Sequence, residues 1–265
     1  MTDYVTSADG TRIGFDRVGS GPPVVLVGGA MQFRAFDPST TEMAGHLASH
    51  GFEVVNYDRR GRGDSPAESP ITLAQTLEDL CGLIDELTEG ADDAVALFGN
   101  SSGATIALAA AAAGLPVSKL VLFEAPLDVE LGTEGAEYLG ALRTALADGG
   151  SEAGIELYMA DMPPEWLAGL KSSGAWPMVS AIGPSLEPDA ESLAWTQSAP
   201  RRELWAGITQ PTLVLVGTET MDFMEAAADS LVANLPHAEK RAIAASDHRW
   251  EPRTLALVIA EFLVG

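Results

Sequence analysis

One short segment of the sequence has the residue types that nucleophilic catalysis requires. Gly99-Asn100-Ser101-Ser102-Gly103 follows directly on an apolar run that ends at Phe98 and precedes an alanine-rich stretch. This order predicts a strand, a sharp turn that carries Ser101, and a helix over residues 104–113. The glycines leave room for close backbone packing, and the helix amino terminus offers N–H groups to a negatively charged oxygen. The segment indicates a serine nucleophile, and a plain Gly/Ser loop before a helix is the alternative.

A serine hydroxyl needs a base that accepts its proton, and imidazole has a suitable pKa for this task. The chain offers four histidines. His46 and His50 are spaced as on a surface helix, without the glutamate of the zinc-binding helix motif between them. His237 follows a proline in a predicted loop. Only His248 lies just beyond the last predicted strand and before the terminal helix. It is therefore the remaining candidate for the base, and a structural histidine in a loop is the alternative.

The elements around these residues alternate between strands and helices. Short, continuously apolar runs are typical of parallel strands covered on both faces, and the clearest helix, from Leu73 to Leu87, has one apolar face. The alternation predicts an α/β fold with a mostly parallel, doubly wound sheet, in which ligands bind beyond the carboxyl ends of the strands. The predicted strands are Tyr4–Thr6 and Arg12–Val18, which form a hairpin, and then Val24–Val27, Phe52–Tyr57, Ala94–Phe98, Leu120–Phe123, Thr212–Val216 and Lys240–Ala244.

Residues 126–205 have no clear strand pattern and are predicted to be helices interrupted by prolines and glycines. We therefore expect residues 1–125 and 206–265 to form the core and residues 126–205 to form a helical cap over the sheet. Large apolar side chains are concentrated in this cap. Each of them is best explained by packing, but together they favour a small, moderately hydrophobic substrate. They are Tyr158, Met159, Met162, Trp166, Trp176, Met178 and Trp195.

Four segments together resemble the α/β-hydrolase family, and the resemblance covers essentially the whole chain. Besides the segment around Ser101, they are Val24–Ala30, which is similar to the family's oxyanion-hole loop, Asp58–Ser65, which is similar to an architectural loop rich in arginine and glycine, and Ser246–His248 after the last strand. The resemblance implies an α/β-hydrolase fold with a helical cap insertion. It also implies that Ser101 is the nucleophile and His248 the base.

The acid of this implied triad departs from the family's usual pattern. An aspartate commonly stands three residues after the glycine that ends the penultimate strand, and here that position is Thr220. Glu219 and Asp222 are near enough to replace it. Glu124 is the favoured candidate because it follows the strand ending at Phe123, and because the zearalenone-type lactonases, to which this arrangement is modestly similar, carry their acid after the same strand.

The resemblance also implies an oxyanion hole made of two backbone N–H groups, those of Ala30 and Ser102. Gly28-Gly29 replaces the family's usual His-Gly pair, which removes an imidazole and keeps the backbone donor. A serine nucleophile argues against the haloalkane dehalogenase and epoxide hydrolase branches, which attack with a carboxylate. No metal and no organic cofactor is implied.

The composition excludes some partners. A formal net charge of −23 with only three lysines disfavours binding to nucleic acid or to anionic membranes, which requires clustered basic side chains. The start of the chain lacks the pattern of a signal peptide, and no apolar stretch of about 18 residues is present, so we expect a cytoplasmic protein. The sequence does not determine the oligomeric state, and a homodimer stays open beside a monomer.

Together these observations predict a serine hydrolase of the EC 3.1 type, which cleaves an ester, a lactone or a related carbonyl compound through an acyl-enzyme at Ser101. The missing aspartate and the Gly28-Gly29 pair keep two alternatives open. One is a ligand-binding protein without hydrolytic activity. The other is lyase, perhydrolase or cyclase chemistry at the same serine. The sequence does not identify the substrate.

Overall fold

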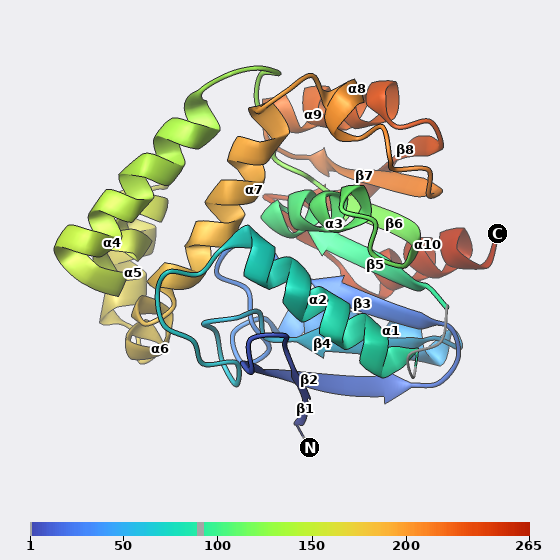
Figure 1. Ribbon diagram of the computed structural model, residues 1–265, viewed down its shortest axis with the longest axis horizontal. Helices are drawn as coiled ribbons and strands as arrows, with labels where there is room; N and C mark the ends of the chain where they lie inside the picture. The colour runs from blue at the N-terminus through green and yellow to red at the C-terminus, as the bar shows by residue number, and fades with distance from the viewer. Residues whose placement is uncertain (1, 89–92) are drawn as a thin grey trace.

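The fold is known from a computed structural model that describes residues 2–88 and 93–265 (Figure 1). Its centre is a nine-stranded sheet with the order β1-β2-β4-β3-β5-β6-β7-β8-β9. All pairings from β4 to β8 are parallel, whereas β1, β2 and β9 join antiparallel. The strands are β1 (Asp3–Thr6), β2 (Arg12–Gly19), β3 (Pro23–Val27), β4 (Glu53–Tyr57), β5 (Val95–Asn100), β6 (Val117–Phe123), β7 (Thr212–Glu219), β8 (Ala238–Ser246) and β9 (Arg249–Trp250).

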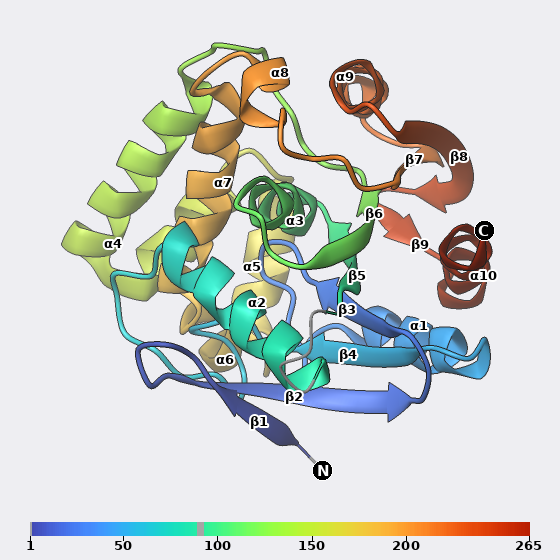
Figure 2. The ribbon, with the colours of Figure 1, turned by 45° about the vertical axis from the view of Figure 1, so that its right-hand side comes forward.

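Helices cover both faces of this sheet, which confirms the predicted mostly parallel, doubly wound architecture. One face carries α2 (Leu73–Leu87), α3 (Ser102–Ala112) and α9 (Asp222–Asn234), and the other carries α1 (Pro38–Ser49) and α10 (Pro252–Val264) (Figures 1 and 2). Successive side chains of a strand point to opposite faces, so each strand contributes to two separate cores. Val25 and Val27 of β3 belong to the first core, and Val24 and Leu26 belong to the second.

The end of the sheet differs from the prediction at one point. The two-residue strand β9 follows His248 and pairs antiparallel with Ser246 and Ala245, so β8 is not the last strand. A strand of two residues has no periodicity that the sequence could reveal. Because β9 returns immediately, Asp247 and His248 form a tight turn in which both residues have positive φ, 49° and 61°.

The insertion between β6 and β7 consists of helices joined by loops, and we call residues 126–205 the cap. Within these residues, all of which are described, no strand is present. Helix α7 lies between α4 and the core helix α3, so it connects the cap to the rest of the molecule (Figure 1). The cap elements are α4 (Glu134–Tyr158), α5 (Pro164–Ser172), α6 (Trp176–Ser180), the 3-10 turn η1 (Gly183–Leu186), α7 (Glu187–Gln197) and α8 (Arg201–Leu204).

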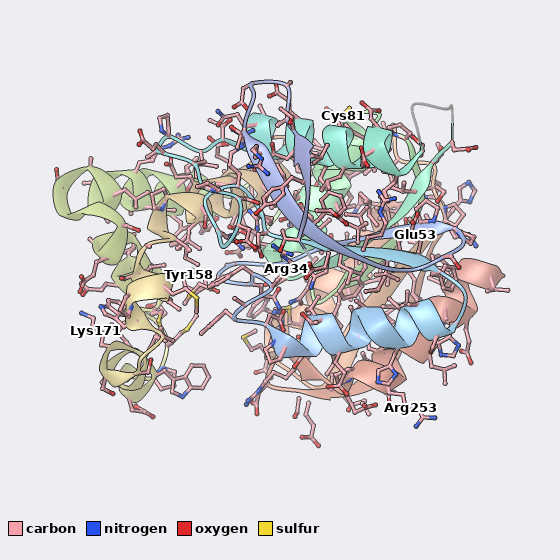
Figure 3. All side chains as sticks on the ribbon, turned by 90° about the horizontal axis from the view of Figure 1, so that it is seen from below. Arg34, Glu53, Cys81, Tyr158, Lys171 and Arg253 are labelled. Atoms are coloured by element: carbon pink, nitrogen blue, oxygen red, sulfur yellow. The ribbon has the colours of Figure 1, made fainter. Side chains whose placement is uncertain are left out.

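The loop Asp58–Ser65 after β4 is held by ion pairs. Arg34, labelled in Figure 3, contacts Asp58 at 3.0 Å, Asp64 at 2.7 Å and Asp16 of β2 at 2.7 Å. The guanidinium group thereby joins the loop to the neighbouring strand and to the segment before α1.

Across the described residues, no helix has both the length and the apolar character needed to span a bilayer.

Candidate active site

Ser101 occupies a strained turn between β5 and α3. Its backbone has φ 55° and ψ −128°, a conformation that side-chain-bearing residues adopt only when the surroundings enforce it. The Ser101 N–H donates to the carbonyl oxygen of Phe123 at 2.9 Å, which fixes the turn to the end of β6. A Cβ atom at Gly103 would lie 2.2 Å from the carbonyl oxygen of Val27, so only glycine permits this close packing against β3. The turn therefore presents Ser101 at the carboxyl end of the sheet.

Glu124 is the first residue after β6, and its carboxylate contacts His248. Its φ is 45°, its side chain is almost fully buried, and its N–H donates to the carbonyl oxygen of Leu215 at 2.9 Å. One carboxylate oxygen, Oε1, accepts a hydrogen bond from the Gly217 N–H at 2.9 Å, and the other, Oε2, is hydrogen-bonded to Nδ1 of His248. The structure thus brings Glu124 and His248 together across the end of the sheet.

The carboxylate of Glu124 stays charged at neutral pH. Burial alone would raise its pKa, but the hydrogen bonds from His248 and from the Gly217 N–H hold that pKa below its ordinary value. The Thr220 hydroxyl also lowers the pKa of Glu124, although among the described residues it makes no hydrogen bond of regular geometry. A buried, ionised carboxylate on Nδ1 fixes the tautomer in which Nε2 of His248 can accept a proton.

The other two acid candidates have exposed side chains. Asp222 begins α9 and is exposed, and Glu219 at the end of β7 is exposed as well. Neither carboxylate forms a hydrogen bond with His248 in the part of the chain that the structure describes. Glu219 contributes only its backbone carbonyl, which accepts from the Asp247 N–H at 3.0 Å and supports the turn before His248.

Apart from Leu131 of the cap, the described non-glycine residues with positive φ belong to the turns and loops that carry the candidate site. Ser101, Glu124 and His248 all have positive φ, and so does Met31 in the loop after β3, where φ is 61°. Such conformations cost about 1–3 kcal/mol each and cluster at functional sites. Within the described chain, no hydrogen bond joins the Ser101 hydroxyl to the His248 ring, and catalytic hydrogen bonds are often long before substrate binds.

The oxyanion-hole loop predicted around Ala30 packs directly against Ser101. A Cβ atom at Gly29 would lie 2.7 Å from the carbonyl oxygen of Asn100 and 2.9 Å from Cβ of Ser101, so this contact requires glycine. The Ala30 N–H, one of the two predicted oxyanion donors, already donates to the side-chain oxygen Oγ of Ser102 at 2.9 Å. No pattern in the sequence indicates that the side chain of Ser102 accepts from this donor.

Sequence reasoning also missed Asp189, a buried carboxylate of α7 that reaches the same loop. Asp189 is 4% exposed and accepts hydrogen bonds from Arg59 at 2.6 and 3.1 Å, from Arg62 at 2.7 Å and from Oγ of Ser102 at 2.6 Å. Burial would raise the pKa of Asp189, but the charges of Arg59 and Arg62 hold it below its ordinary value. Burial and the charge of Arg59 lower the pKa of Arg62 to about 10, so the Arg62 guanidinium group remains protonated at neutral pH.

An apolar cluster fills the space between the cap and the oxyanion-hole loop. Met159 and Phe33 are buried in it, and Tyr158, Met162 and Trp176 pack against it from the cap. Ala30 and Met31 pack against it from the loop. The remaining large cap residues lie elsewhere. Trp195 packs on the first core, the one that contains Val25 and Val27, and Trp166 and Met178 are exposed.

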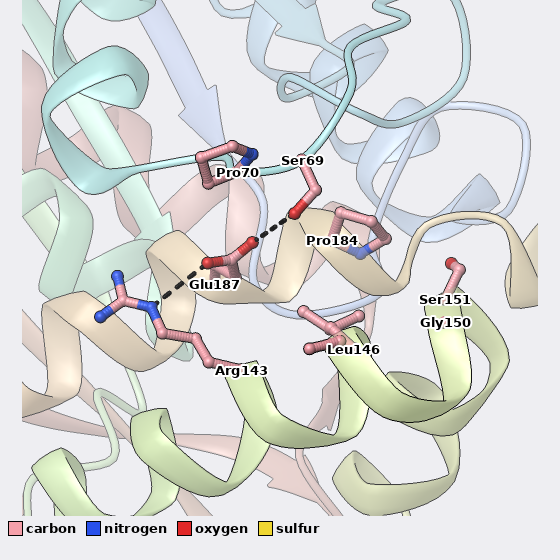
Figure 4. Close-up of a pocket in the computed structure, with 9 residues that line it drawn as sticks. Ser69, Pro70, Arg143, Leu146, Gly150, Ser151, Pro184 and Glu187 are labelled. Carbon is pink, nitrogen blue, oxygen red and sulfur yellow. Dashed lines mark hydrogen bonds and ion pairs between the residues drawn. The ribbon is translucent and has the colours of Figure 1, made fainter.

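A separate pocket of about 570 Å³ lies between α4, the start of α7 and the loop at Ser69 (Figure 4). Glu187 accepts from the Ser69 hydroxyl at 3.0 Å and from Arg143 at 3.3 Å along this pocket. None of Ser101, Glu124 and His248 lines it. The pocket therefore lies at the junction of cap and core, away from the strained residues.

Comparisons with known proteins identify the family and the fold. The model of the alpha/beta hydrolase family matches residues 24–259. A haloperoxidase-like, non-heme protein of Mycobacterium phage D29 is 31% identical over 103 residues, which cover 38% of this chain and 34% of that protein. The match thus spans about a third of the length of that curated relative.

Solved structures match over nearly the whole chain. An alpha/beta hydrolase from Sphaerobacter thermophilus is 34% identical with a TM-score of 0.81, and the match covers 98% of this chain and 100% of that one. An esterase from Thermogutta terrifontis has 20% identity and a TM-score of 0.72, covering 100% and 97% of the two chains. An enol-lactonase from Burkholderia xenovorans has 20% identity and a TM-score of 0.68, covering 99% and 100%. The matched family and these folds leave one conclusion: the chain belongs to the alpha/beta hydrolase family.

Proposed function

We propose that this hydrolase cleaves a carboxylic ester or a lactone through an acyl-enzyme on Ser101. The observation that carries the proposal is the presence of three strained residues at the carboxyl edge of the sheet, after β5, β6 and β8. Ser101 follows β5, Glu124 follows β6 and His248 follows β8, and the buried carboxylate of Glu124 holds the His248 ring. A nucleophile, a base and a group that orients the base are the requirements of acyl transfer.

The reaction begins when Nε2 of His248 accepts the proton of Ser101 and the serine oxygen attacks the substrate carbonyl carbon. The carbonyl oxygen becomes negatively charged and accepts hydrogen bonds from the backbone N–H groups of Ser102 and Ala30. His248 then gives its proton to the leaving alkoxide, which departs as an alcohol. A water molecule, deprotonated by His248, attacks the acyl-enzyme, releases the carboxylic acid and restores Ser101.

The contacts of the oxyanion-hole loop support a moderately hydrophobic substrate. Ala30 and Met31 border the apolar cluster of the cap, which includes Phe33, Met159 and Trp176. A substrate whose carbonyl lies at Ser101 therefore has its apolar part next to this cluster, where burial of apolar surface contributes to binding.

The test combines covalent labelling with turnover. The protein is treated with a fluorophosphonate probe, the labelled peptide is mapped, and hydrolysis of p-nitrophenyl acetate and butyrate is measured in parallel. We expect a single label at Ser101 and, in Ser101→Ala, loss of both labelling and hydrolysis with an unchanged melting temperature, because only the nucleophilic oxygen is removed.

A label on another residue, or hydrolysis retained by Ser101→Ala, would overturn the proposal. If the wild-type protein neither takes the label nor turns over any ester or lactone, the non-hydrolytic ligand-binding alternative explains the same geometry better.

A further inference from the structure

The cap and the oxyanion-hole loop share one buried hydrogen-bond chain. It runs from Asp189 on α7 to the Ser102 hydroxyl at 2.6 Å, and from Oγ of Ser102 to the Ala30 N–H at 2.9 Å. Ionised Asp189 can only accept, so the Ser102 hydroxyl must donate to it. The lone pairs of Ser102 Oγ are then directed to the remaining donor, the Ala30 N–H. The carboxylate thus determines which way the hydroxyl faces.

The same carboxylate anchors the loop by a second route. Asp189 pairs with Arg59, which also donates to the carbonyl oxygen of Gly28 at 3.1 Å. It pairs with Arg62 too, which donates to the carbonyl oxygen of Gly29 at 2.6 Å. Two carbonyl groups and one N–H group of consecutive loop residues are therefore held by partners that converge on one cap side chain.

We propose that Asp189 and the Ser102 hydroxyl are positioning residues, which hold the backbone of Ala30 beside Ser101 and thereby make the cap a part of the oxyanion site. The single hydrogen of the Ala30 N–H is then shared between Oγ of Ser102 and the oxyanion as negative charge develops. This inference rests on the proposed function, because an oxyanion forms only if Ser101 attacks a carbonyl group. Oxyanion-hole donors are effective because they are fixed before charge develops, and a charge-assisted hydrogen bond to a buried carboxylate is a strong way to fix them.

Ser102→Ala is the sharpest variant, because it removes the hydroxyl and leaves both buried ion pairs of Asp189 intact. Asp189→Asn is less suitable. In the described part of the chain, Asp189 is the only carboxylate that pairs with Arg59 or Arg62, so this change would leave buried guanidinium charge uncompensated and could unfold the protein.

Ser192→Ala is the matched control. Ser192 is also fully buried on α7. Its hydroxyl is hydrogen-bonded to the Thr105 hydroxyl of α3 at 2.6 Å and to the backbone carbonyl oxygen of Asp189 at 2.8 Å, and it does not contact the Asp189 carboxylate. The control therefore removes a buried hydroxyl between the same two helices without touching the oxyanion-hole loop. A merely structural effect of losing one cap-to-core hydrogen bond should appear equally in both variants.

Two readouts on the intact protein test the inference. The first is hydrogen exchange of the Ala30 amide, which needs no turnover, and we expect it to be faster in Ser102→Ala and unchanged in Ser192→Ala. The second is ester hydrolysis together with inhibition by phenylboronic acid, whose adduct with a serine carries a tetrahedral oxyanion. We expect Ser102→Ala to lower kcat on the order of 10- to 100-fold and to weaken boronate inhibition by a similar factor, with KM nearly unchanged.

Each other outcome contradicts the inference. Unchanged exchange would show that the hydroxyl does not hold the amide. Faster exchange with unchanged or higher kcat would show that the hydroxyl restrains the amide without serving the reaction, or competes with the substrate for it. Equal losses of kcat in Ser102→Ala and Ser192→Ala would show that both hydroxyl groups serve only the packing of the cap on the core. Failure of the proposed function looks different, because the wild-type protein itself would then show no fluorophosphonate label and no hydrolysis.

Discussion

At the scale of single residues, the proposed catalysis depends on which carboxylate orients the imidazole ring of His248. Glu124 is buried and bonded to Nδ1, whereas Asp222 is exposed on α9. We expect Glu124→Gln to lower kcat by roughly two to four orders of magnitude, because an amide keeps the shape but cannot stabilise an imidazolium. Asp222→Asn, the matched isosteric control, should leave kcat within about a factor of two.

Steady-state kinetics with p-nitrophenyl butyrate and thermal melts of both variants provide the measurement. A strongly reduced kcat in Asp222→Asn, with nearly normal kcat in Glu124→Gln, would show that Asp222 is the acid. The acid would then lie after β7, where the family usually has it. Two mild variants would mean that His248 works without a carboxylate, or that hydrolysis is not the reaction.

The sequence was informative where a residue type has few alternative uses. The turn at Ser101 and the choice of His248 followed from strand ends and from the resemblance, and Glu124 was favoured because it directly follows a strand. Asp189 could not be found in this way. Asp189 lies in a helix of the cap and belongs to no recognisable motif. Its contacts with Arg59, Arg62 and Ser102 form only when α7 packs onto the core.

At the scale of elements, the loop after β3 must lie very close to the turn that carries Ser101. We expect Gly29→Ala to lower kcat about 10- to 100-fold, because the new methyl group would meet the Asn100 carbonyl at 2.7 Å and push the loop and its N–H donors away. Gly45→Ala is the control, since Gly45 lies in α1 with open space around its Cβ position.

The two glycine variants should differ in stability as well as in activity. Replacing a helical glycine by alanine stabilises a protein by about 0.5–1 kcal/mol, so Gly45→Ala should melt slightly higher with normal kcat. Thermal melts and ester kinetics on both proteins give the comparison. Normal kcat in Gly29→Ala would mean that the loop can shift without harm and that its contact with Ser101 is not needed.

The elements themselves were largely predictable, because continuous apolar runs and a 3.6-residue period specify parallel strands and α2 without tertiary information. The ends of the elements were not. β9 exists only because its two residues pair with β8, and the turn before it depends on positive φ at Asp247 and His248, which no local propensity favours.

At the scale of the whole molecule, the acidic surface opposes the compact state. The chain has 38 acidic and 15 basic residues. Several carboxylates therefore share one basic side chain, as Asp16, Asp58 and Asp64 share Arg34. Like charges repel over a Debye length of about 30 Å at 10 mM salt and about 8 Å at 150 mM. We therefore expect the melting temperature at pH 7.5 to rise by about 2–4 °C when NaCl is raised from 10 to 150 mM, equivalent to roughly 1 kcal/mol.

Differential scanning calorimetry at the two salt concentrations measures this change, with 280 mM sucrose at 10 mM NaCl as the control for a similar osmotic strength without ions. A lower melting temperature at high salt would show that surface ion pairs stabilise the fold more than the excess negative charge destabilises it.

The position of Glu124 has a consequence for engineering and for divergence of the fold. With Glu124 as the proposed acid, nucleophile and acid both precede the cap in the chain, and the turn between β7 and α9 contains no member of the proposed triad. Met221 in that turn is exposed, and so are Asp222 and Phe223 at the start of α9. Exposed turns tolerate changes of sequence and length better than the elements they join. An inserted peptide or a grafted recognition loop is therefore best placed after Met221, where Thr220 and Glu219 keep their positions beside Glu124 and His248.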